Sequence, residues 1–249
     1  MRLGLVAGGG NLPDIIIKKF PDAAVARIIT ARGKEGAGRK FFISDLKGVI
    51  SYFRGERVDT VAMTGDVYDA KPRISPDLIR LMLRVLFMRR RHDGILRLVI
   101  REFEKSGMRV VGVQELLPEL LVPRGTPTKT KPSADDTAAI MRNWTDVRKF
   151  AASDKGQGAI IRNGRITATE TSAGTDRLIL SNRGDILIKL SKPNQDMRAD
   201  IPIIGASTIE NLAKTGYRGI AAEAGKTIFD DARATIRAAN RHKIFIIGV

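Results

Sequence analysis

Near its start the chain reads Leu3-Gly4-Leu5-Val6-Ala7-Gly8-Gly9-Gly10-Asn11-Leu12-Pro13, and this segment indicates the architecture of the first half. Its first five residues form the short apolar run of a buried strand, and three glycines follow immediately. Pro13 suits the first turn of a helix, which we expect to end near Phe20. A buried strand, a glycine turn and a helix are the first parts of a βαβ unit, so a parallel sheet is predicted.

The same alternation continues through the first domain, for which we predict residues 1–122. Strands that alternate with helices form parallel βαβ units with right-handed crossovers, which places this domain in the α/β class. The further strands are expected at 24–30, 58–63 and 108–113, and the further helices at 44–53, 76–90 and 94–105.

Four prolines between Pro118 and Pro132 change the character of the chain and predict an inter-domain linker at 123–132. A second α/β domain is expected at 133–249, and its first helix should run from a cap at Ser133 to about residue 152. Asn163-Gly164 indicates a hairpin because both residues tolerate positive φ, so this sheet is predicted to be mixed. Strands are expected at 159–162, 165–170, 185–190, 201–204, 219–222 and 243–249, and further helices at 207–215 and 230–241.

The composition is that of a strongly basic globular protein. The 249 residues include 43 Lys and Arg against 27 Asp and Glu, and the formal net charge of +16 favours an anionic partner. Nucleic acid, an anionic membrane face and a phosphorylated small molecule all fit this charge, but the aromatic content of 5% argues against a stacking platform for single-stranded nucleic acid. The chain has no cysteine, no run of about 18 apolar residues and no signal-peptide core, which favours the cytoplasm.

The positive charge is concentrated between Lys71 and Arg109, where eleven Lys or Arg stand against four Asp or Glu. Within this basic stretch, the run Arg89-Arg90-Arg91-His92 is either the solvated end of a helix or a contact with anionic lipid headgroups.

Glycine-rich turns supply candidate phosphate sites. The loop after the first strand could cradle an anion at a helix N-terminus, although Pro13 stands where a dinucleotide fingerprint needs glycine. Thr64-Gly65-Asp66 follows the third expected strand and should face the same edge of the sheet, unless both loops are plain turns. Ala224-Gly225-Lys226-Thr227 is similar to the end of a Walker A loop, but Ile220 replaces a required glycine, so a structural turn is favoured.

The segment 192–205, which reads KPNQDMRADIPIIG, alternates carboxylates with cations. Pro193 and Pro202 flank the charged part and disfavour a helix. Such a loop suits a divalent metal held together with a phosphate, although a solvated charged loop is the alternative. His92 and His242 lie far apart in a chain without cysteine, so a hard cation bound by carboxylates is the one metal that we predict.

The loops around the expected hairpin are further candidate sites. They are either simple turns or sites that bind phosphate and supply a carboxylate: Gly156-Gln157-Gly158, Glu170 and Gly174-Thr175-Asp176.

Taken together, these motifs resemble those of the LpxI family, which are UDP-2,3-diacylglucosamine pyrophosphatases of lipid A biosynthesis. The likeness runs essentially from end to end and rests on the following segments: Gly8-Gly9-Gly10-x-Leu12-Pro13, Gly65-Asp66-Val67, Leu96-Arg97, Glu102-Phe103-Glu104, Pro123-Arg124-Gly125, Gly156-Gln157-Gly158-Ala159, Gly174-Thr175-Asp176 and 192–205. It implies a Rossmann-like N-terminal domain, an α/β C-terminal domain and a ligand cleft between them. It also implies a divalent metal, Mg²⁺ or a cation such as Mn²⁺, and water attack on the α-phosphate to give UMP and 2,3-diacylglucosamine 1-phosphate (lipid X).

The resemblance also implies roles for individual residues, and Asp200 matches the essential aspartate of the family. The expected catalytic residues are Asp200, Asp196, Lys192 and Arg198; the expected metal ligands are Asp200, Asp176 and Glu170; the expected substrate-binding residues are Gly9, Gly10, Asn11, Leu12, Gly65, Gln157, Gly174 and Thr175. Two departures are visible: His92-Asp93-Gly94 stands where relatives often carry Gly-Asp-Asp, and Ile203 replaces a usual threonine, so neither position receives a role.

The expected partners are a lipid-linked nucleotide sugar and the anionic inner face of the cytoplasmic membrane, contacted peripherally through the basic stretch. No nucleic acid is expected, and a homo-oligomer is compatible with the sequence. Two other functions stay open on the residues alone. An NAD(P)-dependent oxidoreductase would rest on the N-terminal glycines, and a basic nucleic-acid-binding protein would rest on charge.

Overall fold

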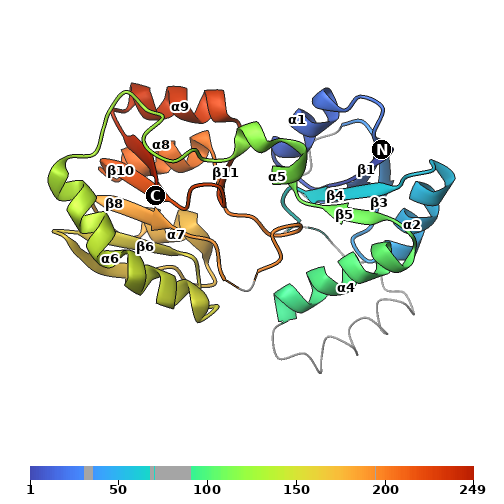
Figure 1. Ribbon diagram of the computed structural model, residues 1–249, viewed down its shortest axis with the longest axis horizontal. Helices are drawn as coiled ribbons and strands as arrows, with labels where there is room; N and C mark the ends of the chain where they lie inside the picture. Colours follow the sequence, from blue (N-terminus) through green and yellow to red (C-terminus); the bar gives the residue numbers. More distant parts are fainter. Residues whose placement is uncertain (31–35, 68–69, 71–90, 194) are drawn as a thin grey trace. The chain divides into compact units, whose positions relative to one another are not determined.

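The computed structural model describes residues 1–30, 36–67, 70, 91–193 and 195–249, with the side chains of 91–93 excepted. The chain forms two compact units (Figure 1). Unit 1 comprises Met1–Pro118 together with Asp196–Asp200, and unit 2 comprises Glu119–Gln195 and Ile201–Val249. The expected helix at 76–90 and much of the basic stretch lie outside the described residues.

Unit 1 is built on a five-stranded parallel sheet in the order β3-β2-β1-β4-β5, which is the Rossmann strand order without its sixth strand. The predicted parallel α/β fold is therefore confirmed. The sequence pattern did not indicate β3, because Arg39 and Lys40 leave it without an apolar run. The strands are β1 (Leu3–Ala7), β2 (Ala24–Ile28), β3 (Arg39–Phe41), β4 (Thr60–Thr64) and β5 (Arg109–Val111).

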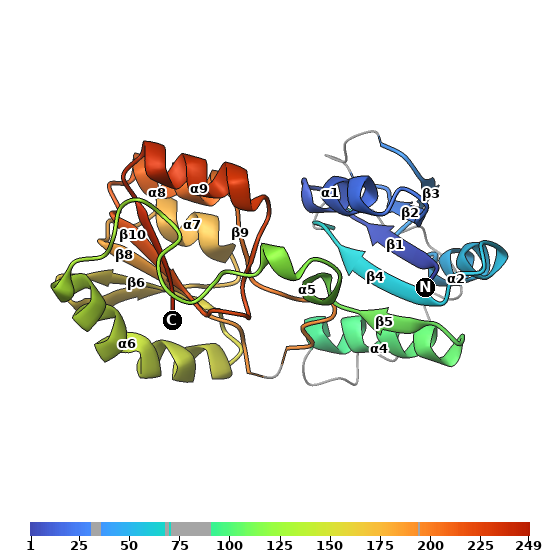
Figure 2. The same ribbon diagram turned by 45° about the horizontal axis from the view of Figure 1, so that its top comes forward.

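Helices cover both faces of this sheet (Figure 2). Phe53 of α2 and Phe103 of α4 pack together on one face, with their ring centroids 6.1 Å apart. Helix α2 begins where the Asp45 side chain accepts a hydrogen bond from the Gly48 backbone N–H, and α1 lies on the opposite face. The helices of the first half are α1 (Leu12–Lys19), α2 (Leu46–Gly55), α4 (Arg91–Lys105) and α5 (Val113–Leu116), and a short 3₁₀ helix spans Pro118–Leu120.

Unit 2 contains a mixed five-stranded sheet in the order β12-β10-β8-β6-β7, as the hairpin signal predicted. Strands β8, β10 and β12 are parallel, and β6 runs antiparallel to β7 and β8. Asn163 and Gly164 adopt φ of 51° and 73°, so the hairpin turn has the expected conformation. The strands are β6 (Gly158–Arg162), β7 (Arg165–Thr169), β8 (Ile186–Lys189), β10 (Gly219–Ala222) and β12 (Phe245–Gly248), and a separate parallel pair is formed by β9 (Ile203–Ile204) and β11 (Ile228–Phe229).

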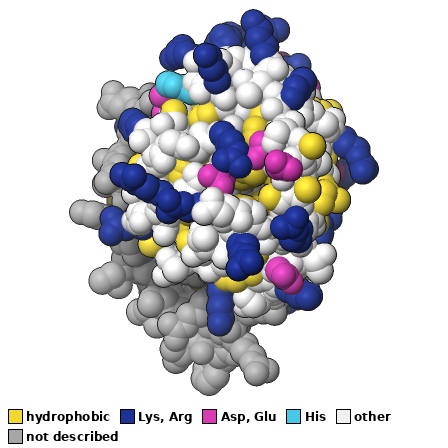
Figure 3. All heavy atoms as spheres, turned by 90° about the vertical axis from the view of Figure 1, so that its left-hand side faces the viewer, with side chains coloured by type: hydrophobic (Ala, Val, Ile, Leu, Met, Phe, Trp, Pro, Cys, Tyr) yellow, Lys and Arg dark blue, Asp and Glu magenta, His cyan; other side chains and the backbone are white. Residues whose placement is uncertain are grey.

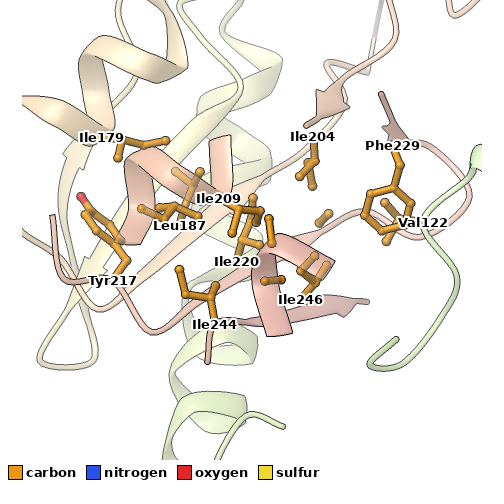
Figure 4. Packing of buried hydrophobic residues seen from close by; sticks show 14 of the residues in the cluster. Val122, Ile179, Leu187, Ile204, Ile209, Tyr217, Ile220, Phe229, Ile244 and Ile246 are labelled. Atoms are coloured by element: carbon orange, nitrogen blue, oxygen red, sulfur yellow. The ribbon is translucent and has the colours of Figure 1, made fainter. Parts of the chain in front are cut away.

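The core of unit 2 follows the alternation of side chains along each strand. Leu187 packs with Ile220 and Ile246 against three helices on one face (Figure 4). Ile186 and Ile188 point to the other face, where they contact α6. The helices of unit 2 are α6 (Ala134–Ala152), α7 (Gly174–Leu180), α8 (Ala206–Lys214) and α9 (Ala232–Arg241).

The segment that we predicted as a linker, residues 123–132, is part of unit 2 and is hydrogen-bonded to its sheet. The N–H of Ile246 donates to Thr128 Oγ1 over 3.0 Å, and Gly125 forms a bridge with Gly248. These hydrogen bonds attach residues 125–128 to the edge of the sheet. Among the helices of the described residues, none combines the length and the apolarity needed to cross a membrane.

Candidate active site

The two glycine loops of unit 1 meet at the carboxyl ends of β1 and β4. The N–H of Gly9 donates to Asp66 O over 2.7 Å, and the N–H of Asp66 donates to Gly9 O over 3.0 Å. Gly65 has φ of +92°, and a Cβ there would stand 2.5 Å from Gly9 O, so only glycine fits. The loops therefore lie side by side at the expected ligand edge, with the Gly9 amide already engaged.

The remaining residues of the first loop have different surroundings. Gly10 is exposed, and a Cβ at this position would meet no described atom within 4 Å. Asn11 precedes α1 and accepts at its backbone oxygen from Ile15 N, whereas the side chain of Leu12 is buried in the core. Gly10 and Asn11 are thus the part of this loop that faces solvent.

Residues Asp196–Asp200 belong to unit 1, although the chain on both sides of them belongs to unit 2. Ala199 packs against the hydrophobic core of unit 1. Asp196 accepts two hydrogen bonds from the Arg198 guanidinium, at 2.9 Å to Nε and 2.7 Å to Nη2. The third nitrogen of Arg198 donates to Glu104 on α4 over 2.7 Å. This fork therefore fastens the segment to unit 1.

The fork also keeps both Asp196 and Arg198 ionised. Hydrogen bonds from Arg198 hold the pKa of Asp196 below its usual value, and burial opposes them only partly. The same bonds raise the pKa of Arg198. Asp196 and Arg198, both predicted as catalytic residues, are thus paired opposite charges that shape the loop.

Asp200 closes this turn. Its backbone N–H donates to Asp196 O over 2.9 Å, and the residue is half-buried. The position of the Asp200 carboxylate therefore depends on the turn that Asp196 and Arg198 hold together.

Lys192 lies in unit 2 and has an acidic partner that the sequence did not indicate. Its ammonium nitrogen is 3.0 Å from Asp154 Oδ1, and its backbone N–H donates to Gln195 Oε1 over 2.9 Å. Asp154 follows α6 and adopts a left-handed φ of 64°. Lys192 is consequently held in one orientation with about a fifth of its side chain exposed.

A second cluster in unit 2 gathers two predicted site residues, Gln157 and Thr175, around a third, Glu170. The buried Glu170 carboxylate accepts from Thr175 Oγ1 over 2.7 Å and from the Gln157 N–H over 2.8 Å. A Cβ at Gly156 would stand 2.8 Å from the Glu170 backbone and side chain, which explains the glycines beside Gln157. Glu170 therefore organises this loop through neutral donors.

Gly174-Thr175-Asp176 was expected to be a loop, but it forms the first turn of α7. Asp176 faces Asn211, whose Nδ2 lies 3.2 Å from Asp176 Oδ1. Among the residues that the structure describes, no group of three or more His, Cys, Asp and Glu is arranged to hold a metal ion.

The Ala224–Thr227 turn is structural, as the missing glycine indicated. Its backbone N–H groups are engaged by carbonyl oxygens: Ala224 N–H with Val249 O, Gly225 N–H with Val122 O, and Lys226 N–H with Glu223 O. These amides are therefore not presented to a phosphate.

Sequence reasoning missed three acidic residues that hold the predicted cations or their loops, namely Glu104, Asp154 and Glu223. Glu223 directly follows a parallel strand, a position that favours ligand-facing residues and could have been singled out. The pairings of Glu104 and Asp154 leave no local signal, because their partners lie 94 and 38 residues away.

The arrangement defines a two-unit α/β protein with paired glycine loops in unit 1 and charged loops in both units. Comparison with known families matches residues 2–120 to the LpxI N-terminal domain and residues 123–247 to the LpxI C-terminal domain. The chain therefore belongs to the LpxI family.

One curated relative is similar to this chain over nearly its whole length. It is the protein named UDP-2,3-diacylglucosamine pyrophosphatase LpxI from Caulobacter vibrioides, and the identity is 31% over 275 aligned positions. The alignment covers 100% of this chain and 97% of the relative.

Proposed function

We propose that this chain hydrolyses the pyrophosphate bond of UDP-2,3-diacylglucosamine in lipid A biosynthesis, releasing UMP and 2,3-diacylglucosamine 1-phosphate. The observation that carries the proposal is the match of both LpxI domains in order along the chain, together with the name of the 31% identical relative. The chain is accordingly a hydrolase that acts on a phosphoric anhydride.

Asp200 is the residue that we assign to the chemistry. It ends a turn that is fixed from within by Asp196 and Arg198, so its carboxylate is held without a large entropic cost. In this position it orients the attacking water or holds a cation at the α-phosphate. Lys192 stabilises the negative charge that develops on the phosphate oxygens.

A divalent cation would reach this site together with the phosphates of the substrate. A cage of protein ligands has no support in the described residues, because three acidic side chains do not converge there. Mg²⁺ commonly binds through one or two carboxylates and the phosphates of a substrate, and Asp200 would serve as such a carboxylate. When bound, the ion would neutralise phosphate charge and polarise the reacting phosphorus.

The nucleotide side of the substrate is assigned to Gly10 and Asn11, the solvent-facing part of the first loop, with Gly65 holding that loop in place. The cluster around Glu170 supports the loop at Gln157 and Thr175 and is assigned to the sugar-phosphate side.

The acyl chains require the protein to meet a membrane, and we assign a peripheral contact with the anionic inner face of the cytoplasmic membrane. Figure 3 shows Lys and Arg side chains spread over the face of the molecule that it presents, with few acidic side chains between them. Binding to liposomes should need anionic lipid and should weaken with salt. Equal binding to neutral vesicles would contradict this assignment.

The test is incubation with UDP-2,3-diacylglucosamine, with and without Mg²⁺, followed by analysis for UMP. The variant Asp200→Asn should release no UMP while it keeps the circular dichroism spectrum of the wild type. Asp146→Asn, on the exposed face of α6, is the matched control and should retain full turnover. Near-normal turnover by Asp200→Asn would overturn the assignment of Asp200.

A further inference from the structure

Glu223 is a buried acidic residue at the carboxyl end of β10. Its backbone N–H donates to Lys189 O at the end of the neighbouring strand β8, over 3.3 Å, and its side chain is 7% exposed. Ligands of α/β sheets bind outside the carboxyl ends of parallel strands, so Glu223 stands at the edge where a ligand is expected.

Each oxygen of the Glu223 carboxylate has its own set of partners. Oε2 accepts from the backbone N–H of Ser191 over 3.2 Å and also from the Ser191 hydroxyl. Oε1 lies 3.1 Å from Arg148 Nη2 and 3.0 Å from Lys226 Nζ. Burial opposes ionisation, but the hydrogen bonds from Ser191 and Lys226 outweigh it and hold the pKa of Glu223 below its usual value. The carboxylate is therefore charged and fully engaged.

The shared oxygen brings the two cations close together. Because Arg148 Nη2 and Lys226 Nζ both contact Oε1, they are at most about 6 Å apart, a separation that one phosphate group can span. Their side chains are 43% and 54% exposed, so each keeps a face that a ligand can reach. Two cations around one carboxylate leave a net positive charge.

A third cation is fixed to the same edge. Ser191 precedes Lys192, so the contact with Glu223 anchors the start of the loop that carries the Lys192 ammonium. The partner of Lys192, Asp154, follows the end of α6, and Arg148 is carried on the last turns of the same helix. The contacts of one buried carboxylate thus hold two cations directly and anchor the loop that carries a third.

We propose that Arg148 and Lys226, together with Lys192, form a phosphate-binding subsite for the diphosphate of the substrate, and that Glu223 is the positioning residue that assembles it. This inference rests on the proposed function. The alternative is an ion-pair cluster that only stabilises the fold and binds nothing.

The sign of one substitution separates the two interpretations. Glu223→Gln removes a negative charge beside two cations, Arg148 and Lys226, so simple Coulomb attraction would strengthen the binding of an anion. If Glu223 assembles the subsite, the same substitution weakens binding, because the one accepting oxygen of Gln cannot serve both Ser191 and the two cations.

The probe is inorganic pyrophosphate, titrated calorimetrically into the full chain at low ionic strength. We expect Arg148→Gln and Lys226→Gln each to raise the Kd about tenfold, the loss of one charge-assisted contact. Glu223→Gln should also raise it. Arg241→Gln and Glu210→Gln alter an exposed ion pair between α8 and α9 and should leave the Kd unchanged.

Several results would overturn the inference. Equal or tighter pyrophosphate binding by Glu223→Gln removes its positioning role, and unchanged binding by Arg148→Gln and Lys226→Gln removes the subsite. These last two variants decide the question if Glu223→Gln does not fold, since both side chains are half-exposed. If Arg148→Gln and Lys226→Gln lose binding to vesicles of anionic phospholipid but bind pyrophosphate as the wild type does, the two cations contact lipid headgroups. That result would also overturn the inference.

The titration is independent of turnover. Failure of the wild type to hydrolyse UDP-2,3-diacylglucosamine would remove the proposed function, whereas the pyrophosphate Kd values would still confirm or overturn the subsite.

Discussion

Asp196 and Arg198 are expected to act as one unit, and a double-mutant cycle tests this expectation. The two side chains share a fork of hydrogen bonds at 2.9 and 2.7 Å, and the turn that they form carries Asp200. If the two side chains act through this pairing, the double variant should lose no more activity than Arg198→Ala, which also breaks the contact with Glu104. The variants are Asp196→Ala, Arg198→Ala and the combination of the two.

The magnitude follows from the geometry and the exposure of the pair. A hydrogen bond to a charged group contributes about 1.5–3 kcal/mol. The side chains of Arg198 and Asp196 are 35% and 19% exposed, so solvent screening lowers the total for the fork to about 2 kcal/mol. This value corresponds to about a 30-fold loss in kcat/KM, because about 1.4 kcal/mol is a factor of ten.

The assay measures kcat/KM for UMP release from UDP-2,3-diacylglucosamine for all four proteins, with urea unfolding in parallel. Asp196→Ala should lose about 30-fold, Arg198→Ala at least as much, and the double variant no more than Arg198→Ala, which gives a coupling energy of about 2 kcal/mol. A loss of about 1,000-fold in the double variant would refute the reasoning, since additive effects mean that each residue contacts the substrate separately. The control cycle is Glu102→Ala with Lys105→Ala, an exposed pair on α4 whose coupling should stay below about 0.5 kcal/mol.

Three further predictions follow from single residues. Gly65→Ala should weaken the binding of UMP about tenfold or more in an equilibrium titration. The reason is that Gly65 has a φ of +92°, and a Cβ there would press on Gly9 O and separate the two loops. An unchanged Kd for UMP would contradict this prediction. Glu170→Gln should lower the free energy of unfolding, measured in urea, by about 1–3 kcal/mol. The two carboxylate oxygens accept one hydrogen bond each, from the Thr175 hydroxyl and the Gln157 N–H, whereas an amide has one accepting oxygen. Equal stability of the variant and the wild type would count against this prediction. The lowered pKa of Glu223 contributes stability above the unfolded value of about 4.5, and this stability is lost as the pH falls through the lower folded pKa. The difference in unfolding free energy between wild type and Glu223→Gln should therefore shrink between pH 7 and pH 3, and a constant difference would refute it.

Local signals predicted most of the secondary structure. The strand at Leu3–Ala7, the hairpin at Asn163-Gly164 and the cap at Ser133 all appear in the structure, because periodicity, turn conformation and capping depend on neighbouring residues. Helix α7 was missed because it starts in Gly174-Thr175, residue types that are typical of loops. Its helical form depends instead on the burial of Leu178 and Ile179 against the sheet.

The candidate site was predictable in its members but not in their pairing. The sequence placed Lys192, Asp196, Arg198 and Asp200 in one segment, and all four lie on the loop between β8 and β9. It gave no indication that Asp196–Asp200 packs on unit 1, since the burial of Ala199 in that core is a contact over a long distance in the chain.

By itself, the sequence determined the α/β class, the mixed second sheet and the family, because all three are carried by patterns that are read along the chain. Only the tertiary structure decided which charges neutralise one another. Arg198 pairs with Asp196 and Glu104, Lys192 pairs with Asp154, and Arg148 meets Glu223 over 75 residues of sequence. The physical reason is that ion pairing depends on separations of about 3 Å, and the packing of the sheets and helices alone sets those separations.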